Sequence, residues 1–259
     1  MFGILNIVFC SPEYLNIIKN GPAERRRFID LELCQLDKLY LSDLSSFNKV
    51  LNQRNKLLKD ISFRPDLVDT LPVWDMQLLE YGTRIIRKRK EFVEELNEII
   101  SEIHSKISGG REHLVLKYEP NITADLFAEE LLRAQNRDLK LRPTTTGPHR
   151  EDMLLSVDDV DIRKFGSQGQ QRTSALSLKV SEIDLVRRSI HDTPVLLRDD
   201  VLSELDSNRQ NYLLNSIAKI QTVITCTGLE EFVKNRFCIN KIFQVINGNV
   251  YEKESVEEI

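Results

Sequence analysis

The sequence has few of the features that mark secreted, membrane or metal-binding proteins. Its 259 residues include four cysteines, none of them in a Cys-x-x-Cys pair, and four histidines without metal-ligand spacing. We therefore expect reduced thiols and no structural zinc. No apolar run is long enough to span a bilayer, and the apolar first ten residues lack the basic start and the cleavage site of a signal peptide. These absences favour a cytoplasmic protein without membrane contact.

An excess of one charge is also missing. The 36 Lys and Arg residues face 40 Asp and Glu residues, which gives a net charge of −4. Any contact with nucleic acid must therefore come from local basic patches. Only ten Gly and eight Pro occur, and 41% of the residues are hydrophobic. This composition excludes collagen-like and disordered chains, and the length suits one large domain or two modest ones.

The first half of the sequence is charged and helical from about residue 12 to 110. Apolar residues keep helical spacing through 23–59 and again through 73–107, and Pro65 and Pro72 lie in the break between them. Two long helices joined by a short break predict an antiparallel helical hairpin, which is an arm more than a compact bundle.

The second half alternates between strand-like and helical segments. The expected strands are 113–118, 152–157, 194–197 and 221–225, with a closing hairpin around 247–249. The expected helices are 124–135, 173–190 and 207–218. This order is typical of an α/β protein with a parallel sheet.

A glycine-containing loop, Gly166-Ser-Gln-Gly-Gln-Gln-Arg-Thr173, runs directly into an expected helix. Its glycines allow close approach of the backbone, and the helix amides together with the Ser167 hydroxyl would offer an anion site. The alternative is an ordinary helix cap in which a serine precedes an amphipathic helix. Taken alone, the loop favours that structural interpretation.

An apolar strand, Pro194-Val-Leu-Leu197, is followed by Arg198 and two acids, Asp199 and Asp200. Ligands of open α/β sheets bind beyond the carboxyl ends of the strands, and an aspartate there commonly holds Mg²⁺. An adjacent acid can orient a water molecule. The alternative is a solvated turn at the end of the strand.

Together these motifs make the sequence similar to the RecF family of bacterial recombination-mediator and DNA-repair ATPases. The matching segments are 9–13, 21–28, 146–150, 165–175, 199–206 and 221–225. The resemblance implies an α/β ABC-ATPase head with an inserted α-helical arm, here without the strand-loop-helix that carries the Walker A motif. It implies a strand of the head at 1–11, the arm at 12–110 and the C-terminal part of the head at 111–259.

The resemblance also implies roles for individual residues. Ser167, Gln168, Gly169, Gln170 and Gln171 would form the signature loop that contacts the γ-phosphate of ATP held by a facing subunit. Asp199 would bind Mg²⁺, Asp200 would polarise water, and Ser203 to Asp206 would form the D-loop at the dimer interface.

For the whole protein, the family implies ATP-dependent binding to single-strand/double-strand junctions of gapped DNA, with Mg²⁺ as cofactor and weak ATPase activity. It further implies an ATP-dependent homodimer, recombination-mediator partners, recombinase loading, replication restart and a part in the SOS response.

The sequence departs from the family pattern in three places. No glycine is followed by lysine, so Gly-x-x-x-x-Gly-Lys-Ser/Thr is absent, and we expect a chain that corresponds to the family's C-terminal portion. Arg198 stands where an aliphatic residue is usual, and Thr225-Cys-Thr227 contains no switch histidine. An inactive remnant or a partner-binding fragment is the alternative function; a chromosome-organising protein with the same head is a third.

Two basic clusters are candidates for DNA contacts. The first is Arg25, Arg26 and Arg27, and the second includes Arg84 and Lys88. Nearby glutamates make a solvated helix face the favoured interpretation of the second cluster. We interpret His149, in a Gly-Pro-His-Arg loop, as structural or near the interface.

Overall fold

The computed structural model describes residues 6–199, 212, 217, 220–225 and 240–253, and the chain divides into two compact units, Met1–Ile224 and Thr225–Ile259. The second unit contains β7 (Ile242–Ile246) and β8 (Asn249–Lys253), an antiparallel pair joined through Asn247 and Gly248. Both turn residues have positive φ, 50° and 81°. The hairpin expected around Asn247 to Asn249 is thereby confirmed.

The first unit begins with a short strand and a series of helices. These are β1 (Ile7–Cys10), η1 (Pro12–Leu15), α1 (Asn16–Lys19), α2 (Pro22–Leu36) and α3 (Lys38–Asp60). The expected single helix over 23–59 is therefore two helices. They separate at Asp37, which has an extended backbone and accepts hydrogen bonds from the amides of Leu39 and Tyr40 at 2.8 and 3.2 Å.

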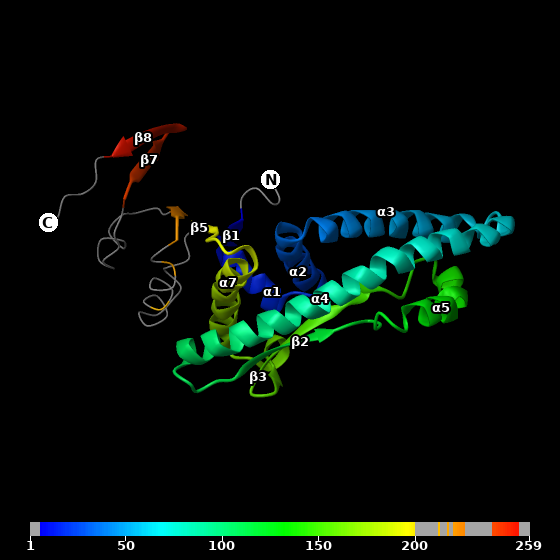
Figure 1. The fold of residues 1–259 in the computed structure, drawn as a ribbon, viewed down its shortest axis with the longest axis horizontal. Helices are drawn as coiled ribbons and strands as arrows, with labels where there is room; N and C mark the ends of the chain where they lie inside the picture. Colours follow the sequence, from blue (N-terminus) through cyan, green and yellow to red (C-terminus); the bar gives the residue numbers. More distant parts are fainter. Residues whose placement is uncertain (1–5, 200–211, 213–216, 218–219, 226–239, 254–259) are drawn as a thin grey trace. The chain divides into compact units, whose positions relative to one another are not determined.

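A second long helix returns alongside α3. After η2 (Pro65–Thr70), α4 (Leu71–Ser108) begins with Pro72 in its first turn and ends at Gly109, whose φ is +67°. Proline is tolerated in a first turn, and glycine readily adopts the left-handed conformation that stops a helix. Figure 1 shows α3 and α4 side by side, so the predicted helical hairpin is confirmed.

The helix α5 (Phe127–Leu141) packs against this hairpin at a glycine. A Cβ atom on Gly82 of α4 would lie 2.6 Å from a ring carbon of Phe127 and 3.1 Å from one of Phe47. Both phenylalanines are buried. The missing side chain at Gly82 therefore lets two aromatic rings reach the α4 backbone.

An antiparallel sheet lies beside α4. It has the order β2 (Leu114–Glu119), β3 (Asp152–Val157) and β4 (Val160–Asp161), and Leu116 is paired with Leu155. Asp158 and Asp159, at φ of 49° and 64°, form an acidic turn between β3 and β4. The amide of Leu116 donates to Asn97 Oδ1 at 2.7 Å, which ties the sheet to α4.

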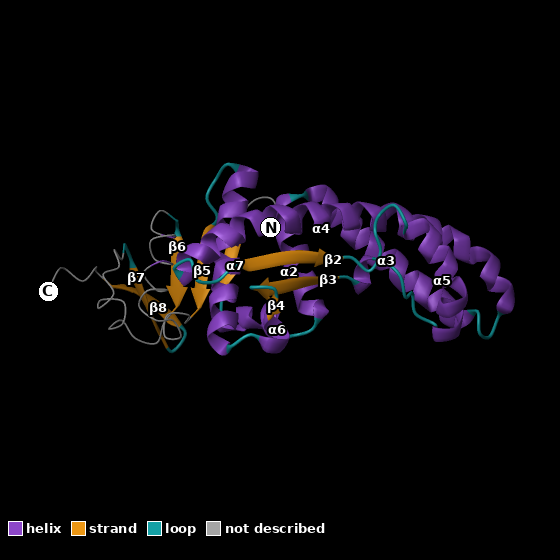
Figure 2. Cartoon of the chain, turned by 90° about the horizontal axis from the view of Figure 1, so that it is seen from below, coloured by secondary structure: helices purple, strands orange, loops and turns teal. Residues whose placement is uncertain are grey.

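The other sheet of the first unit brings together strands from the beginning and the end of that unit. After α6 (Ile162–Phe165) and α7 (Gln168–Ile190), the chain enters β5 (Val195–Asp199), which lies between β1 and β6 (Thr222–Thr225). β1 and β5 are parallel, with Val8 opposite Leu196. Figure 2 shows α7 beside this sheet. The predicted strand-helix-strand order is confirmed here, with α7 beginning five residues earlier than expected.

Some expectations concern residues outside this description. The helix expected at 207–218 lies almost wholly outside the described residues. The side chain of Arg198 and the segment 226–239 also lie outside them. The division into a strand at 1–11, an arm at 12–110 and a head at 111–259 stays a prediction.

Candidate functional site

The loop that the sequence singles out is an exposed helix start. Ser167 is the N-cap of α7, and its hydroxyl accepts a hydrogen bond from the amide of Gln170 at 3.2 Å. The Gln170 side chain returns the contact by accepting from the amide of Ser167 at 3.0 Å. This reciprocal capping box fixes the first turn of α7, as expected for a helix cap, and the role of these residues as a signature loop stays a prediction.

The two glycines of the loop have different surroundings. A Cβ atom on Gly166 would lie 2.5 Å from the Ile162 carbonyl oxygen, so the backbone of the loop is pressed against α6. A Cβ atom on Gly169 would meet only Ser167 Oγ, at 3.8 Å. Gly166 is therefore required by close packing within the chain, whereas Gly169 faces open space in which another molecule has room to approach the backbone.

α6 packs against the loop and helps to fix its backbone. The Gln171 side chain donates from Nε2 to the Ile162 carbonyl at 2.9 Å, and the Thr173 hydroxyl donates to the Gly169 carbonyl at 2.7 Å. Asp161 caps α6 by accepting from the amide of Arg163 at 2.9 Å. Ser167, Gln168 and Gly169 are exposed above these contacts. The result is a fixed backbone with an open outer face.

The helix behind the loop is anchored to α4. His104 Nδ1 lies 2.9 Å from Ser177 Oγ, and His104 Nε2 lies 3.2 Å from a carboxylate oxygen of Glu112. His104 and Ser177 are completely buried. This serine, histidine and glutamate resemble a hydrolase triad in composition, but the burial of the hydroxyl leaves no path for a substrate. Their effect is to hold α7 against α4.

The acidic motif is only partly described. Asp199 is exposed at the carboxyl end of β5, which lies next to the parallel strand β1. Asp200, Ser203 and Asp206 lie outside the described residues. The position of Asp199 at a strand end is as expected for a ligand-binding edge of an α/β sheet. The roles assigned to these four residues stay predictions.

Two of the three arginines in the first basic cluster donate hydrogen bonds to other residues of the chain. Arg25 is buried and forms a two-pronged ion pair with Asp152, at 2.6 and 2.9 Å, and it also donates to the carbonyls of Ile17 and Asn20. Arg26 donates to the Glu151 carbonyl at 2.6 Å, and burial lowers its pKa. Arg27 is exposed. Arg25 therefore has a structural role, and its buried guanidinium is not accessible to a phosphate of DNA.

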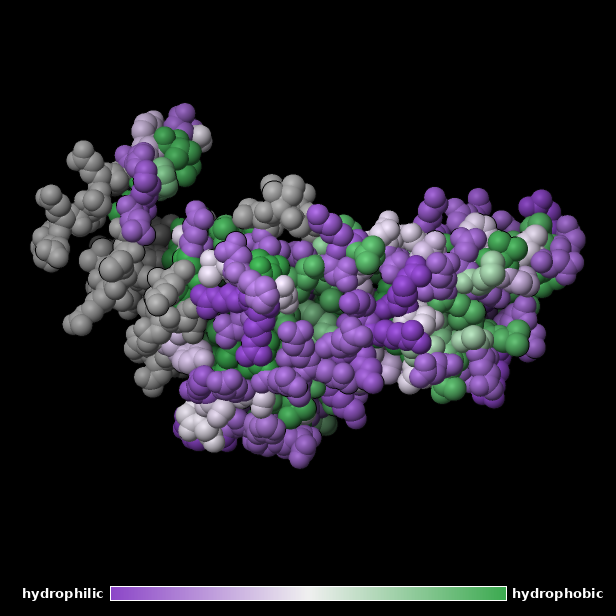
Figure 3. Space-filling model, in the orientation of Figure 1, coloured by the Kyte–Doolittle hydropathy of each residue, from purple (hydrophilic) through white to green (hydrophobic). Residues whose placement is uncertain are grey.

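The second basic cluster lies on the surface of α4 among acids. Arg84 donates twice to Asp43, at 2.8 Å each, and Lys88 lies 3.5 Å from Asp37. Both cations remain about half exposed. Figure 3 shows one face of the chain, on which hydrophilic and apolar residues are interspersed. DNA binding by Arg84 and Lys88 stays a prediction, and ion pairing with neighbouring acids accounts for their present geometry.

A buried arginine of α4, next to Lys88 in the sequence, connects four segments. Arg89 of α4 donates to Glu151 at 2.6 Å, to Asp30 of α2 at 2.8 Å and to the Pro148 carbonyl at 2.8 Å. It also contacts the Tyr40 hydroxyl at 3.0 Å. Burial raises the pKa of Glu151 while Arg89 opposes the shift. Only the Thr-Gly-Pro-His-Arg motif signalled that this region matters.

A second buried arginine stabilises the far end of the hairpin. Arg54 of α3 donates to Asp75 of α4 at 2.6 Å and to Asp138 of α5 at 2.7 Å. It also donates to Thr144 at 2.8 Å. No pattern in the sequence distinguishes Arg54 from the exposed lysines around it, so this cluster was missed.

His149 lies between these two clusters. Its Nε2 donates to the Thr144 carbonyl at 2.9 Å, and its ring lies 6.0 Å from that of Phe47. Burial lowers the pKa of His149 to about 4, against the opposing effect of the hydrogen bond to Thr144. The imidazole is therefore neutral near pH 7, which agrees with the expected structural role.

Two further observations concern metals and membranes. Within the ranges that the structure describes, no three His, Cys, Asp or Glu side chains gather closely enough to hold a metal ion. The helices of the described part include none that is both long and apolar enough to cross a membrane.

The fold and the loop-helix-strand arrangement define a class, the α/β proteins of ABC-ATPase type. No protein-family model matches the chain. The protein named DNA replication and repair protein RecF in Agathobacter rectalis is 74% identical over 250 residues, which cover 96% of this chain and 69% of that relative. The RecF protein of Acetivibrio thermocellus is 45% identical over 261 residues, or 97% and 71% of the two chains. The chain belongs to the RecF family of DNA replication and repair proteins.

Solved structures give the same result. The structure described as the recombination mediator protein RecF-ATP in the RecFOR pathway matches with a TM-score of 0.88 at 36% identity, covering 98% of this chain and 69% of that one. The corresponding RecF-ATPrS structure matches with the same TM-score and identity, covering 97% and 68%.

Proposed function

We propose that this chain acts in DNA repair by contacting, through its signature loop, ATP held by a facing ATPase head. The observation that carries the proposal is the exposed and capped loop from Ser167 to Gln171, in a chain similar to a protein described as RecF-ATP. Hydroxyl and amide groups at a helix start are suited to an anionic γ-phosphate.

The loop residues fit this ligand in two respects. The Ser167 hydroxyl is exposed, and Gly169 has open space where a side chain would otherwise stand. The Gln168 and Gly169 amides lie in the first turn of α7, where no carbonyl of the same helix accepts from them. We assign the contacts to the phosphate to Ser167, Gln168, Gly169, Gln170 and Gln171.

We assign the binding of Mg²⁺ to Asp199, at the carboxyl end of β5. A carboxylate beyond a parallel strand is suited to Mg²⁺, which prefers oxygen ligands. Asp200 would polarise the attacking water, and Ser203 and Asp206 would contact the facing subunit. ATP and Mg²⁺ together would supply the charge that draws two heads together.

At the level of the cell, we propose ATP-dependent binding to junctions of single- and double-stranded DNA in gaps, recombinase loading with recombination-mediator proteins, and support of the SOS response. Family membership and the likeness to a RecFOR-pathway protein support this part. Among the basic residues of the first cluster, exposed Arg27 is the one best placed for a phosphate of DNA.

The test is ATP-dependent association with an intact relative, such as the 74% identical protein. The 259-residue chain is mixed with the relative, with and without ATP, and complex formation is measured by analytical ultracentrifugation. Gly169→Asp places a negative charge where the γ-phosphate would lie, and it should abolish the ATP-dependent complex. Gly21→Asp is the matched control, because a Cβ there meets no atom within 4 Å and one at Gly169 meets only Ser167 Oγ, at 3.8 Å; it should leave the complex intact.

Equal association of the wild type and Gly169→Asp would contradict the proposal. A second candidate function is binding to a partner head without hydrolysis, favoured by the lack of Gly-x-x-x-x-Gly-Lys-Ser/Thr in the 259 residues. ATP turnover by the purified chain distinguishes the two candidates. ATP turnover by the wild type that is lost in Asp199→Asn favours an active ATPase. If the wild type shows no turnover, the partner-binding function is favoured.

A further inference from the structure

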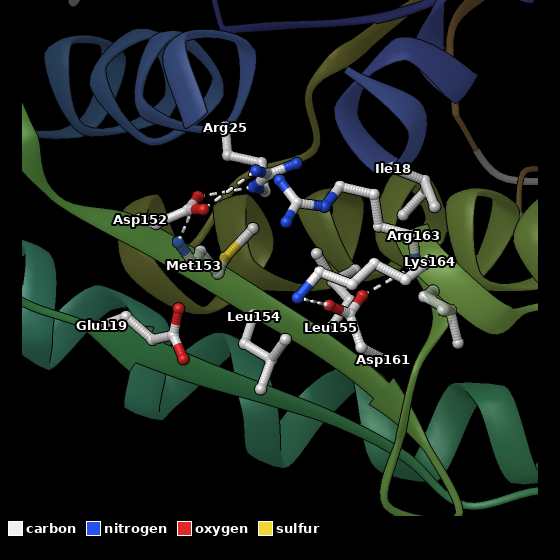
Figure 4. Close-up of a pocket in the computed structure, with 11 residues that line it drawn as sticks. Ile18, Arg25, Glu119, Asp152, Met153, Leu154, Leu155, Asp161, Arg163 and Lys164 are labelled. Atoms are coloured by element: carbon white, nitrogen blue, oxygen red, sulfur yellow. Dashed lines mark hydrogen bonds and ion pairs between the residues drawn. The ribbon is translucent and has the colours of Figure 1, made fainter. Parts of the chain in front are cut away.

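A hollow of about 300 Å³ lies beside α6. β3 forms one wall, and α1, α2 and the start of α6 form the others (Figure 4). Apolar side chains of Ile18, Met153, Leu154 and Leu155 line it together with charged groups. Its volume is at the lower end of the range for small-molecule sites. The hollow shares no side chain with the loop, so an inference from it is independent of the proposed function.

Two of the three cations in the hollow already have carboxylate partners. Arg25 is held by Asp152 in a two-pronged pair, and that pair, opposing the effect of burial, keeps the pKa of Asp152 below its ordinary value. Lys164 Nζ lies 3.4 Å from Asp161 Oδ2. This separation is longer than a usual charge-assisted hydrogen bond, and the Lys164 side chain is 57% exposed. Lys164 is therefore free to turn toward another anion.

Arg163 is different. Within the described part of the chain, its guanidinium forms no hydrogen bond and no ion pair. Figure 4 shows the side chain reaching across the hollow toward Arg25. Two guanidinium groups thus face one space, whose carboxylates are Asp152, held by Arg25, Asp161, which lies beside Lys164, and the exposed Glu119. An anion between Arg163 and Lys164 would relieve the repulsion between like charges.

We propose that this hollow is a binding site for a phosphate group, with Arg163 as its principal ligand and Lys164 as the second. The planar guanidinium offers paired donors that match the oxygens of phosphate. Arg163 and Lys164 are neighbours on α6, and α6 ends directly before the signature loop. Gly166 and Gln171 contact Ile162 of the same helix, so a bound phosphate would restrain the element on which the loop rests.

The carboxylates that line the hollow favour a phosphate over an amine or a metal cation, because two of the three already accept from donors of the chain. Asp161 already accepts from the amide of Arg163, and Asp152 already accepts from Arg25. Glu119, at the end of β2, is the one lining carboxylate without an ion pair among the described residues, and it is exposed. Its replacement by Gln should strengthen the binding of an anion.

Titration of the 259-residue chain with inorganic phosphate tests the site, by isothermal calorimetry at constant ionic strength with chloride as the reference salt. Arg163→Gln should weaken phosphate binding by about tenfold or more, since a charge-assisted hydrogen bond is removed. Lys164→Gln should weaken it less, and Glu119→Gln should tighten it. Arg87→Gln is the matched control, because Arg87 is an exposed arginine of α4 and its removal changes the net charge equally.

The source of the phosphate is identified by competition. ATP with Mg²⁺ and a short DNA duplex are added in separate arms to the phosphate-bound chain. A competitor that displaces phosphate from the wild type, and that fails to bind Arg163→Gln, is the source; if neither displaces it, free phosphate is the ligand. Phosphate binding that is unchanged in Arg163→Gln would overturn the proposal, and so would binding of an acidic peptide but not of phosphate. Circular dichroism spectra of the variants establish that they are folded.

Discussion

Arg89 Nη1 donates a 2.6 Å hydrogen bond to Glu151 Oε2, across 62 positions of the sequence and with both side chains buried. The same guanidinium reaches Asp30 on α2 and the carbonyl of Pro148. One side chain of α4 thereby fixes α2 and the segment that leads into β3. Because α4 also holds α7 through His104, the signature loop belongs to the same connected framework.

Replacement of Arg89 by Met should destabilise the fold strongly. The change leaves the Glu151 and Asp30 carboxylates without their cation, and loss of one partner of a buried ion pair costs about 3–5 kcal/mol. The free energy of unfolding in urea measures this loss. Arg87→Met on the exposed side of α4 is the control and should change stability by about 0.5 kcal/mol or less. Equal effects of the two substitutions would show that Arg89 has no special structural role.

Gly82→Ala should destabilise the contact between α4 and α5. Alanine is the better helix former by about 1 kcal/mol, but its Cβ would lie 2.6 Å from the buried ring of Phe127. Overpacking a closed core costs about 1–3 kcal/mol, so we expect a net loss. Thermal melting measures it, and Gly82→Ala combined with Phe127→Leu should recover part of the stability. A rise in melting temperature for the single variant would contradict the packing.

His149 should remain neutral down to acidic pH. Burial lowers its pKa to about 4, so between the unfolded value of about 6.5 and about 4 the unfolded chain binds a proton that the folded chain does not. This group therefore contributes stability that is present above pH 6.5 and is lost as the pH falls toward 4. Nuclear magnetic resonance of the ring, assigned with His149→Gln, should show a titration midpoint near 4. A midpoint at 6.5 or above would contradict the burial.

The carboxyls of Glu32 and Glu182 should give the opposite pH dependence. Both are buried; burial raises the pKa of each, their mutual repulsion raises that of Glu32 further, and Lys179 opposes both shifts. The folded state then holds a proton that the unfolded state releases above about pH 4.3, so stability falls as the pH rises above that value.

Glu32→Gln mimics the protonated carboxyl and should raise stability at pH 8 relative to the wild type. Denaturant unfolding from pH 5 to pH 8 measures this, and the slope attributable to Glu32 should disappear in the variant. Glu98→Gln, at an exposed position of α4, is the control and should change neither the stability nor the slope. A variant with the wild-type pH profile would show that Glu32 is ionised in the folded chain.

Local patterns predicted the elements of this fold well, because helix caps and apolar spacing act over a few residues. The capping serine before α7, the glycine after α4 and the acidic turn between β3 and β4 all had their signals in neighbouring residues. The break at Asp37 was missed because the leucines on either side of it keep helical spacing. An aspartate between two such runs was the signal that could have revealed it.

The roles of the arginines could not be predicted in the same way. Arg25, Arg54 and Arg89 resemble their exposed neighbours in sequence, and each finds its carboxylate partner on an element distant in the chain. Arg25 pairs with Asp152, 127 positions away, and Arg54 pairs with Asp138, 84 positions away. Only tertiary packing decides which member of a basic run is buried.

The most direct test of trans recognition is a structure of this chain in complex with an intact, ATP-analogue-bound relative. We expect the Ser167 hydroxyl and the amide of Gly169 within hydrogen-bonding distance of the γ-phosphate bound by the other subunit. A complex in which this loop faces solvent while the γ-phosphate is contacted by other residues would show that the signature loop does not recognise the nucleotide.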